Sequence, residues 1–182
     1  MIYTFLAPGF EEVEALTPVD LLRRCELQVT TVGIGGKIIQ GSHGISVVAD
    51  VEDKEISSFS DAEMIILPGG MPGTLNLEAS PIMNQCLDFC FQNKKWIAAI
   101  CAAPSVLGRK GLLKGKKAVC FEGFESQLFG AEVLYDSVCV DDHFITARGA
   151  GVALDFALKL VEMLISKERS ETLGASMQCI KK

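Results

Sequence analysis

Short apolar runs recur along the chain and alternate with longer stretches of mixed polarity. Each run is about five residues long and stops at glycine, proline or a small residue, a pattern typical of strands buried on both faces. We predict strands at residues 2–7, 28–33, 64–67, 96–100 and 118–121. Residues 34–61 are looser and rich in acids, which predicts a β-rich excursion. Residues 138–147 predict a hairpin that turns at Asp141-Asp142.

The stretches between the runs carry apolar residues at helical spacing. They predict helices at residues 11–25, 81–93, 152–166 and 169–178, and a short helix that opens at residues 101–104. Ser80 before Pro81 marks a helix start, because the hydroxyl can cap free N–H groups and proline fits the first helical position. Between residues 152 and 166 the polar side chains form one narrow stripe. We therefore expect this helix to be buried on most of its circumference.

Strands that alternate with helices predict an α/β fold, with a mostly parallel sheet covered by helices on both faces. The chain has 182 residues and no linker or internal repeat, so we expect a single domain over residues 1–182. Ligands of such folds bind at the carboxyl ends of strands, where loops lead into helices. The candidate loops for a functional site are therefore residues 8–12, 68–74 and 101–104.

Composition and charge exclude several classes of protein. The net charge of −6 argues against a nucleic-acid surface, which needs clustered lysine and arginine. No apolar stretch is long enough for a bilayer and no leader pattern is present, so we expect neither membrane spanning nor secretion. Seven cysteines without regular spacing are typical of a reducing compartment, which predicts a cytoplasmic protein. Cys86 and Cys90 lie among apolar residues, so we expect them in the core and expect no structural metal.

The third loop holds the clearest candidate for chemistry. Cys101 directly follows an apolar strand, and two alanines and a proline come after it. Small neighbours permit a sharp strand-to-helix turn of the kind that exposes the nucleophile of α/β hydrolases. Free N–H groups at the helix start stabilise a thiolate, so we expect a low pKa for the Cys101 thiol. The alternative is a buried cysteine that fills a small gap.

The other two loops carry weaker signals. Residues 68–70 (Pro-Gly-Gly) expose backbone N–H groups, so the amides of Gly70 and Ala102 could form an oxyanion hole. The alternative for these residues is a tight turn. The three acids of residues 11–14 begin a helix and, taken alone, complement its dipole.

Histidine is the usual partner of a catalytic cysteine, and the chain has two. His143 is expected at the wrong end of its strand for the site, and His43 lies in a glycine-flanked loop. Each is predicted to be a surface residue. Neither is tied to Cys101 by spacing, so the residues alone do not demand a cysteine–histidine hydrolase.

Four segments together resemble the ThiJ/PfpI superfamily, also called the DJ-1 superfamily. They are residues 9–24 (GFEEVEALTPVDLLRR), 64–70 (MIILPGG), 97–104 (IAAICAAP) and 146–151 (TARGAG). The match is nearest to the branch of the parkinsonism-associated protein and its bacterial chaperone and deglycase relatives. The resemblance implies a flavodoxin-like three-layer α/β/α sandwich that forms homodimers and needs no cofactor.

The resemblance also implies roles for single residues. Cys101 is the nucleophile, and it is the residue that members of the family oxidise to sulfinic acid. Glu14 reaches Cys101 as a protonated carboxyl, which replaces the dipole interpretation of this acid. Burial and the nearby thiolate keep such a carboxyl neutral, so it can donate a hydrogen bond to sulfur. The amides of Gly70 and Ala102 map onto the oxyanion donors of the family.

Two positions depart from the family pattern. Many members carry histidine where this chain has Phe121, which weakens a histidine-assisted peptidase or amidase. The branch often has arginine near the subunit interface where this chain has His43, which changes the polarity of the site entrance. We expect His43 and Gly69 to be substrate-binding residues.

The leading hypothesis from the resemblance is an enzyme of the deglycase or glyoxalase type. It would act on α-oxoaldehydes or on their adducts with protein thiols and amines, and release a hydroxy acid. Small carbonyl substrates, glycated proteins and a second copy of the chain are the expected partners. One rival is a non-catalytic redox sensor or holdase chaperone with an oxidisable Cys101. Another is a role in thiazole biosynthesis, which rests only on the historical name of the superfamily.

Overall fold

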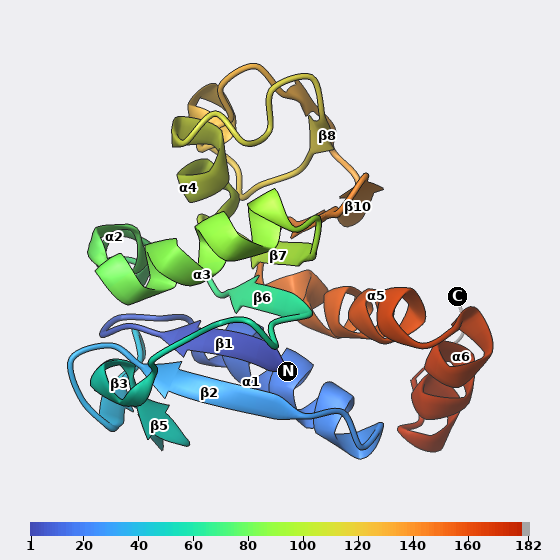
Figure 1. The fold of residues 1–182 in the computed structure, drawn as a ribbon. Helices are drawn as coiled ribbons and strands as arrows, with labels where there is room; N and C mark the ends of the chain where they lie inside the picture. Colours follow the sequence, from blue (N-terminus) through green and yellow to red (C-terminus); the bar gives the residue numbers. More distant parts are fainter. Residues whose placement is uncertain (180–182) are drawn as a thin grey trace.

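A seven-stranded sheet runs through the centre of the computed structural model, which describes residues 1–179 (Figure 1). Its strands are β1 (Ile2–Leu6), β2 (Val29–Gly33), β5 (Val51–Glu52), β6 (Met64–Leu67), β7 (Trp96–Ile100), β10 (Val138–Asp141) and β11 (Phe144–Ala147). Their order across the sheet is β10-β11-β7-β6-β1-β2-β5. All neighbours are parallel except β10 and β11, which form the predicted hairpin. The predicted mostly parallel sheet is confirmed.

Helices cover both faces of this sheet. They are α1 (Glu12–Arg24), α2 (Gly73–Ala79), α3 (Pro81–Gln92), α4 (Pro104–Arg109), α5 (Ala153–Leu164) and α6 (Lys167–Ser176). Apolar residues of α1, α5 and α6 pack on one face, and those of α2, α3 and α4 pack on the other (Figure 1). The chain therefore forms the predicted three-layer α/β/α sandwich.

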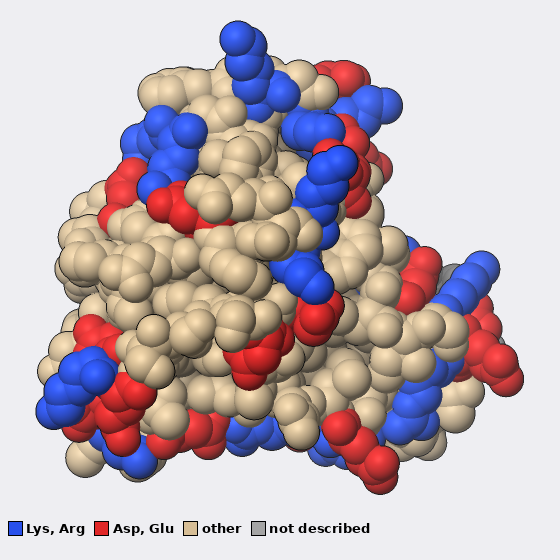
Figure 2. Space-filling view, in the orientation of Figure 1, with Lys and Arg blue, Asp and Glu red and all other residues tan. Residues whose placement is uncertain are grey.

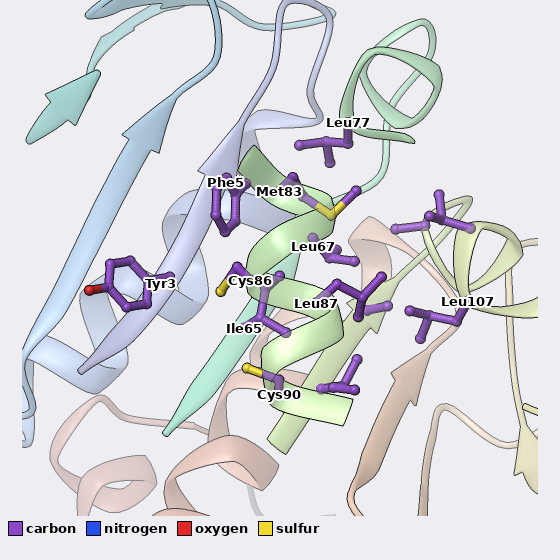
Figure 3. Close-up of a cluster of buried hydrophobic side chains, with 14 of the residues drawn as sticks. Tyr3, Phe5, Ile65, Leu67, Leu77, Met83, Cys86, Leu87, Cys90 and Leu107 are labelled. Atoms are coloured by element: carbon purple, nitrogen blue, oxygen red, sulfur yellow. The ribbon is translucent and has the colours of Figure 1, made fainter. Parts of the chain in front are cut away.

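Each central strand supplies side chains to two separate cores, because successive residues of a strand point to opposite faces. In β6, Ile65 and Leu67 pack on the side of α3, whereas Met64 and Ile66 pack on the side of α1 and α5. Figure 3 shows the first core, to which α3 contributes Met83, Cys86, Leu87 and Cys90. Both cysteines of α3 are thus core residues, as predicted.

Parallel pairing brings the ends of several strands to one edge of the sheet. Leu67 of β6 pairs with Ala99 of β7, and Ile100 of β7 pairs with Ala147 of β11. β1 lies on the other side of β6 and runs in the same direction. The loops that meet at this edge are therefore residues 8–12, 68–74 and 101–104, as predicted, and also residues 148–152.

Residues 118–121 do not form a strand of the central sheet, so this prediction is wrong. Only β8 (Lys117–Ala118) is extended, and it pairs with β9 (Glu132–Val133) in a separate two-stranded sheet. Val119 and Cys120 are nevertheless buried. A short apolar run indicates that a segment is buried, but it does not show whether the segment pairs with another strand. The pattern therefore cannot distinguish a strand of the sheet from a buried loop.

The β-rich excursion of residues 34–61 is confirmed. Within it, β3 (Ile38–Gln40) and β4 (Ser46–Val48) form an antiparallel hairpin outside the main sheet. The short helix α2 was not predicted, because it follows a glycine- and proline-rich loop and has no apolar periodicity of its own. Single helical turns of the 3-10 type occur at Asp53–Glu55, Glu125–Gln127 and Ala150–Val152.

The exposure of α5 differs from the prediction. Its buried residues, which lie on one face, are Ala153, Phe156, Ala157, Leu160 and Val161. Leu154 is 36% exposed, so burial on most of the circumference is wrong. Within residues 1–179, none of the helices has the length and apolarity needed to cross a bilayer.

Candidate active site at Cys101

Cys101 occupies a sharp elbow between β7 and α4. Its φ angle is +65°, a left-handed conformation that is uncommon for a residue with a side chain. The N–H of Cys101 donates to the carbonyl of Ala147 at 2.9 Å, and the N–H of Phe121 donates to the carbonyl of Cys101 at 2.8 Å. These bonds hold the strained turn from two sides. The predicted elbow is therefore present, with Cys101 at the edge where the loops meet.

Glu14, in the first turn of α1, lies against Cys101. Its side chain is buried, with the residue 1% exposed, and its Oε2 accepts a hydrogen bond from the N–H of Gly69 at 2.9 Å. Burial raises the pKa of Glu14 to about 7, although hydrogen bonds with Cys101 and with the Gly69 amide act in the opposite direction. The structure thus brings together Cys101 and the carboxyl of Glu14, the two groups that the family resemblance paired.

Two adjacent glycines let the loop after β6 approach both groups. A methyl group on Gly69 would lie 2.6 Å from Cβ of Cys101 and 2.7 Å from Oε2 of Glu14. Gly70 has a φ of +88°, and a methyl group on it would lie 2.5 Å from the backbone nitrogen of Glu11. No other residue type fits at either position without moving the loop.

The amides of Gly70 and Ala102 face the sulfur of Cys101. Both amides favour the thiolate and lower the pKa of the thiol. A pair of N–H groups that converge on the nucleophile is the arrangement that stabilises an oxyanion formed there. The geometry is consistent with the role that the sequence assigned to Gly70 and Ala102.

The thiol pKa of Cys101 differs from the sequence-based prediction. Burial raises this pKa to about 12, and the charge of the Glu14 carboxylate and its hydrogen bond to the thiol act in the same direction. Position after a strand therefore does not by itself make a thiolate. With Glu14 protonated, the repulsion disappears and the carboxyl becomes a donor. A thiolate at neutral pH thus requires that the proton reside on Glu14.

The other two acids of the helix start have a structural task. Burial alone would raise the pKa of Glu12, but hydrogen bonds from the His43 side chain and from backbone amides, those of His43 and Ile45 included, lower it to about 2. Glu12 therefore anchors the loop of residues 41–45 to α1. Glu11 caps the helix by accepting from the N–H of Val13. The sequence pattern gave no sign of the anchoring role of Glu12.

His43 is bound to these two acids rather than to Cys101. Its Nδ1 lies 2.9 Å from Oε2 of Glu12 and 3.0 Å from Oε2 of Glu11, and both carboxylates raise the pKa of the imidazole. The side chain is 69% exposed, so the prediction of a surface residue is confirmed. These three residues bring potential metal ligands within 4.8 Å of one another, and hydrogen bonding alone accounts for the cluster. Substrate binding by His43 and Gly69 stays a prediction.

His143 is not the surface residue that the sequence predicted. It lies at the start of β11, away from Cys101, as expected from its place in the strand. Its side chain is only 11% exposed, and the imidazole packs against the rings of Phe91 and Phe144. Phe91, which is contributed by α3, and the neighbouring Phe144 cover it.

A cavity of about 360 Å³ lies on the side of Gly149 that faces away from β7 and is separated from Cys101 by this glycine. It is lined by Phe121, Glu122, Ser137, Arg148, Gly149, Ala150, Gly151 and Val152. A methyl group on Gly149 would lie 3.9 Å from Sγ of Cys101 and 3.1 Å from the Phe121 ring, so this glycine lies between the cavity and the sulfur. Sequence analysis did not assign Arg148 or Ser137 to the site. The one available signal was that residues 148–152 follow a buried strand.

Comparison with known proteins identifies close relatives of the whole chain. The model of the DJ-1/PfpI family matches residues 1–163. Protein dj-1beta of Drosophila melanogaster is 33% identical over 175 residues, which cover 94% of this chain and 93% of that protein. A Caenorhabditis elegans relative named glutathione-independent glyoxalase DJR-1.2 is 33% identical over 165 residues, which cover 90% of this chain and 87% of that protein.

Solved structures give the same result. The structure described as oxidized DJ-1 of Toxoplasma gondii superposes with a TM-score of 0.94 at 33% sequence identity. The superposition covers 99% of this chain and 98% of that chain. The similarity therefore includes the elbow, the loop after β6 and the start of α1.

Proposed function

The chain belongs to the DJ-1/PfpI family, and from this membership we propose that it is an enzyme that converts α-oxoaldehydes, or their early adducts with thiols and amines, into hydroxy acids. The observation that carries the proposal is the pairing of Cys101 with the buried carboxyl of Glu14 under two converging amides. The glyoxalase name of the nematode relative supports the same reaction class.

The first step is addition of the Cys101 thiolate to the aldehyde carbon. A sulfur–carbon bond forms, and the carbonyl electrons become an oxyanion held by the amides of Gly70 and Ala102. Glu14, protonated beforehand, gives its proton to this oxyanion and becomes a carboxylate. The product of the step is a hemithioacetal with a general base beside it.

The second step moves a proton between adjacent carbons. The Glu14 carboxylate takes the proton from the former aldehyde carbon, and an enediolate forms. Glu14 returns this proton to the neighbouring carbon, and the hydroxyl proton on the former aldehyde carbon passes to the neighbouring oxygen, which leaves a thioester of a hydroxy acid on Cys101. One carbon is oxidised and the next is reduced, so the conversion is balanced within the substrate. Water then cleaves the thioester, releases the hydroxy acid and restores the thiolate.

The presence of phenylalanine at position 121 agrees better with this scheme than with a histidine-assisted hydrolysis. Its ring, half exposed, lies at the mouth of the cavity where many family members carry an imidazole. Within residues 1–179, Glu14 is the titratable side chain that is hydrogen-bonded to Cys101. We therefore assign the acid–base chemistry at the elbow to Glu14.

We further propose that the working form is a homodimer in the cytoplasm. The cytoplasmic part of this proposal rests on the seven cysteines, which favour a reducing compartment.

The test is lactate production from methylglyoxal by the purified protein and by Cys101→Ser. We expect the wild type to form lactate and Cys101→Ser to lose at least about 100-fold in rate, because the hydroxyl is far less acidic than the thiol. Equal lactate production by both proteins would refute the assignment of Cys101 as the nucleophile. Absence of lactate from the wild type would refute the reaction class.

A redox sensor or holdase chaperone is the second candidate. It is favoured by the partial exposure of Cys101 and by the oxidized state named for the Toxoplasma structure. The same variant discriminates between the functions. A holdase suppresses aggregation of a heat-denatured client equally well with Cys101→Ser, whereas the enzyme loses turnover.

A further inference from the structure

The cavity beside Cys101 is larger than a three-carbon oxoaldehyde needs. Its volume of about 360 Å³ falls within the range of ligand pockets, roughly 300–1,000 Å³. Gly149 forms the contact between this space and the sulfur, as described above. A substrate bonded to Cys101 can therefore extend past Gly149 toward the residues on either side of it.

Arg148 offers an unused positive charge on the wall of this cavity. It is exposed, and with residues 1–179 it forms no ion pair. Among the described residues, the one hydrogen bond that its side chain makes is a long contact of 3.5 Å to the carbonyl of Tyr135. By contrast, Arg23, Arg24 and Arg109 each pair with a carboxylate. Glu122 is the other charged residue on the cavity wall.

We propose that Arg148 binds an anionic group of the substrate, so that the site favours α-oxoaldehydes that carry a carboxylate distal to the reacting carbonyls. This inference rests on the proposed function and names its substrate class. A guanidinium binds a carboxylate through two parallel hydrogen bonds, which fixes orientation as well as charge. Arg148 and Gly149 line the same cavity, so a carboxylate bound to Arg148 lies in the space into which a substrate on Cys101 extends past Gly149.

The first test compares two alkylating reagents at Cys101, iodoacetate and iodoacetamide. They differ in charge and little in size. With each, a sulfur–carbon bond forms and iodide leaves with the electron pair of the carbon–iodine bond. We expect Arg148→Gln to lower the iodoacetate-to-iodoacetamide rate ratio about three- to ten-fold at low ionic strength, and added salt to shrink this difference. Glu122→Gln should raise the ratio. Arg169→Gln, the same charge change on α6, should leave it unaltered.

The second test compares turnover of 4,5-dioxopentanoate with that of the neutral 2-oxopentanal. Conversion of the first to 2-hydroxyglutarate consumes one water, as conversion of methylglyoxal to lactate does. We expect the wild type to prefer the anionic substrate in kcat/KM, and Arg148→Gln to lose about ten-fold of that preference through KM.

The outcomes separate the two proposals. Turnover of both oxoaldehydes without preference, or an alkylation ratio that Arg148→Gln leaves unchanged, would overturn the role of Arg148 and leave the reaction class intact. No turnover of either substrate would overturn the reaction class, and with it the oxoaldehyde specificity. If the iodoacetate-to-iodoacetamide ratio still depended on Arg148 in that case, the result would support only an anion-binding site beside the thiol.

Discussion

At Cys101 and Glu14, two acidic groups are buried against each other and cannot easily ionise together. Loss of one proton from the pair leaves either a thiol that faces a carboxylate or a thiolate that faces a carboxylic acid. Burial raises the pKa of Glu14 to about 7, and the amides of Gly70 and Ala102 lower the pKa of the thiol. Both effects act in favour of the second arrangement, but burial also raises the pKa of the thiol to about 12, so the first arrangement prevails and the thiolate is the minor form of the pair. The reactivity of Cys101 therefore depends on where this one proton resides.

The raised pKa of Glu14 predicts a pH-dependent effect of Glu14→Gln on stability. The unfolded carboxyl titrates near pH 4.3 and the folded one near 7, so between these values the folded state holds more protons and the wild type loses stability as pH rises. Glutamine does not titrate, so Glu14→Gln lacks this pH-dependent loss of stability. We expect the free energy of unfolding of Glu14→Gln, relative to wild type, to increase by about 2–3 kcal/mol from pH 5 to pH 8. Urea unfolding at both pH values measures it, and a constant difference would contradict the buried carboxyl.

Of these two residues, the local sequence identified only Cys101, whose position relative to a buried strand was enough to predict its place at the site. Cys101 was identified because it follows a buried strand and precedes small residues. The local pattern around Glu14 predicted a dipole complement, and only the family resemblance paired it with the cysteine. The low thiol pKa was not supported, because the helix-start rule takes no account of burial or of a carboxyl supplied by another helix.

At the scale of elements, the apolar runs predicted the strands of the sheet because strands buried on both faces lack polar positions. The same rule failed at residues 118–121, which are buried without joining the central sheet. It also missed α2, whose start is set by the loop before it rather than by periodicity. The position of the site was predicted correctly from the strand topology, because the loops that follow parallel strands lie at one edge of the sheet.

The loop after β6 predicts a strong effect of Gly70→Ala. The methyl group would meet the backbone of Glu11 at 2.5 Å and would strain a φ of +88°, so the loop and its amide must move. We expect turnover to fall about 100-fold, the usual cost of losing one oxyanion donor.

Gly111→Ala is the matched control for this change. Its φ is +73°, but nothing lies within 4 Å of the added methyl group. We expect Gly70→Ala to lose at least about 1 kcal/mol more in free energy of unfolding than Gly111→Ala, whose activity is retained. Equal losses in the two variants, with turnover intact, would show that the Gly70 amide is not needed.

At the scale of the whole molecule, apolar and charged surfaces are unevenly distributed. On the face seen in Figure 2, lysine and arginine side chains gather mainly over the upper part of the molecule, with acidic side chains beside them. The β3–β4 hairpin, in contrast, exposes Ile38 and Val48, which are 70% and 66% accessible and pair directly across the strands. Val13 and Leu16 of α1 are also exposed. Exposed apolar patches of this kind mark surfaces for association.

We therefore predict a homodimer that uses the β3–β4 hairpin. Sedimentation at micromolar concentration should give twice the 19.6 kDa of the chain, and Val48→Lys should shift the protein toward monomer. Leu75→Lys, an equally polar change at an exposed position of α2, should leave the dimer intact. A wild type that sediments as a stable monomer would rule out this assembly.

The central claim is that Glu14 holds the proton that Cys101 gives up and then relays it along the substrate. The most direct measurement pairs two readouts in Glu14→Gln: alkylation of Cys101 at pH 7, mapped by mass spectrometry, and lactate formation from methylglyoxal. Glutamine keeps a hydrogen-bond donor and a similar volume but cannot relay a proton. We predict that Cys101 remains the first cysteine to be alkylated while lactate formation is lost. Full lactate formation by Glu14→Gln would show that Glu14 is only a helix-start acid and would contradict this account.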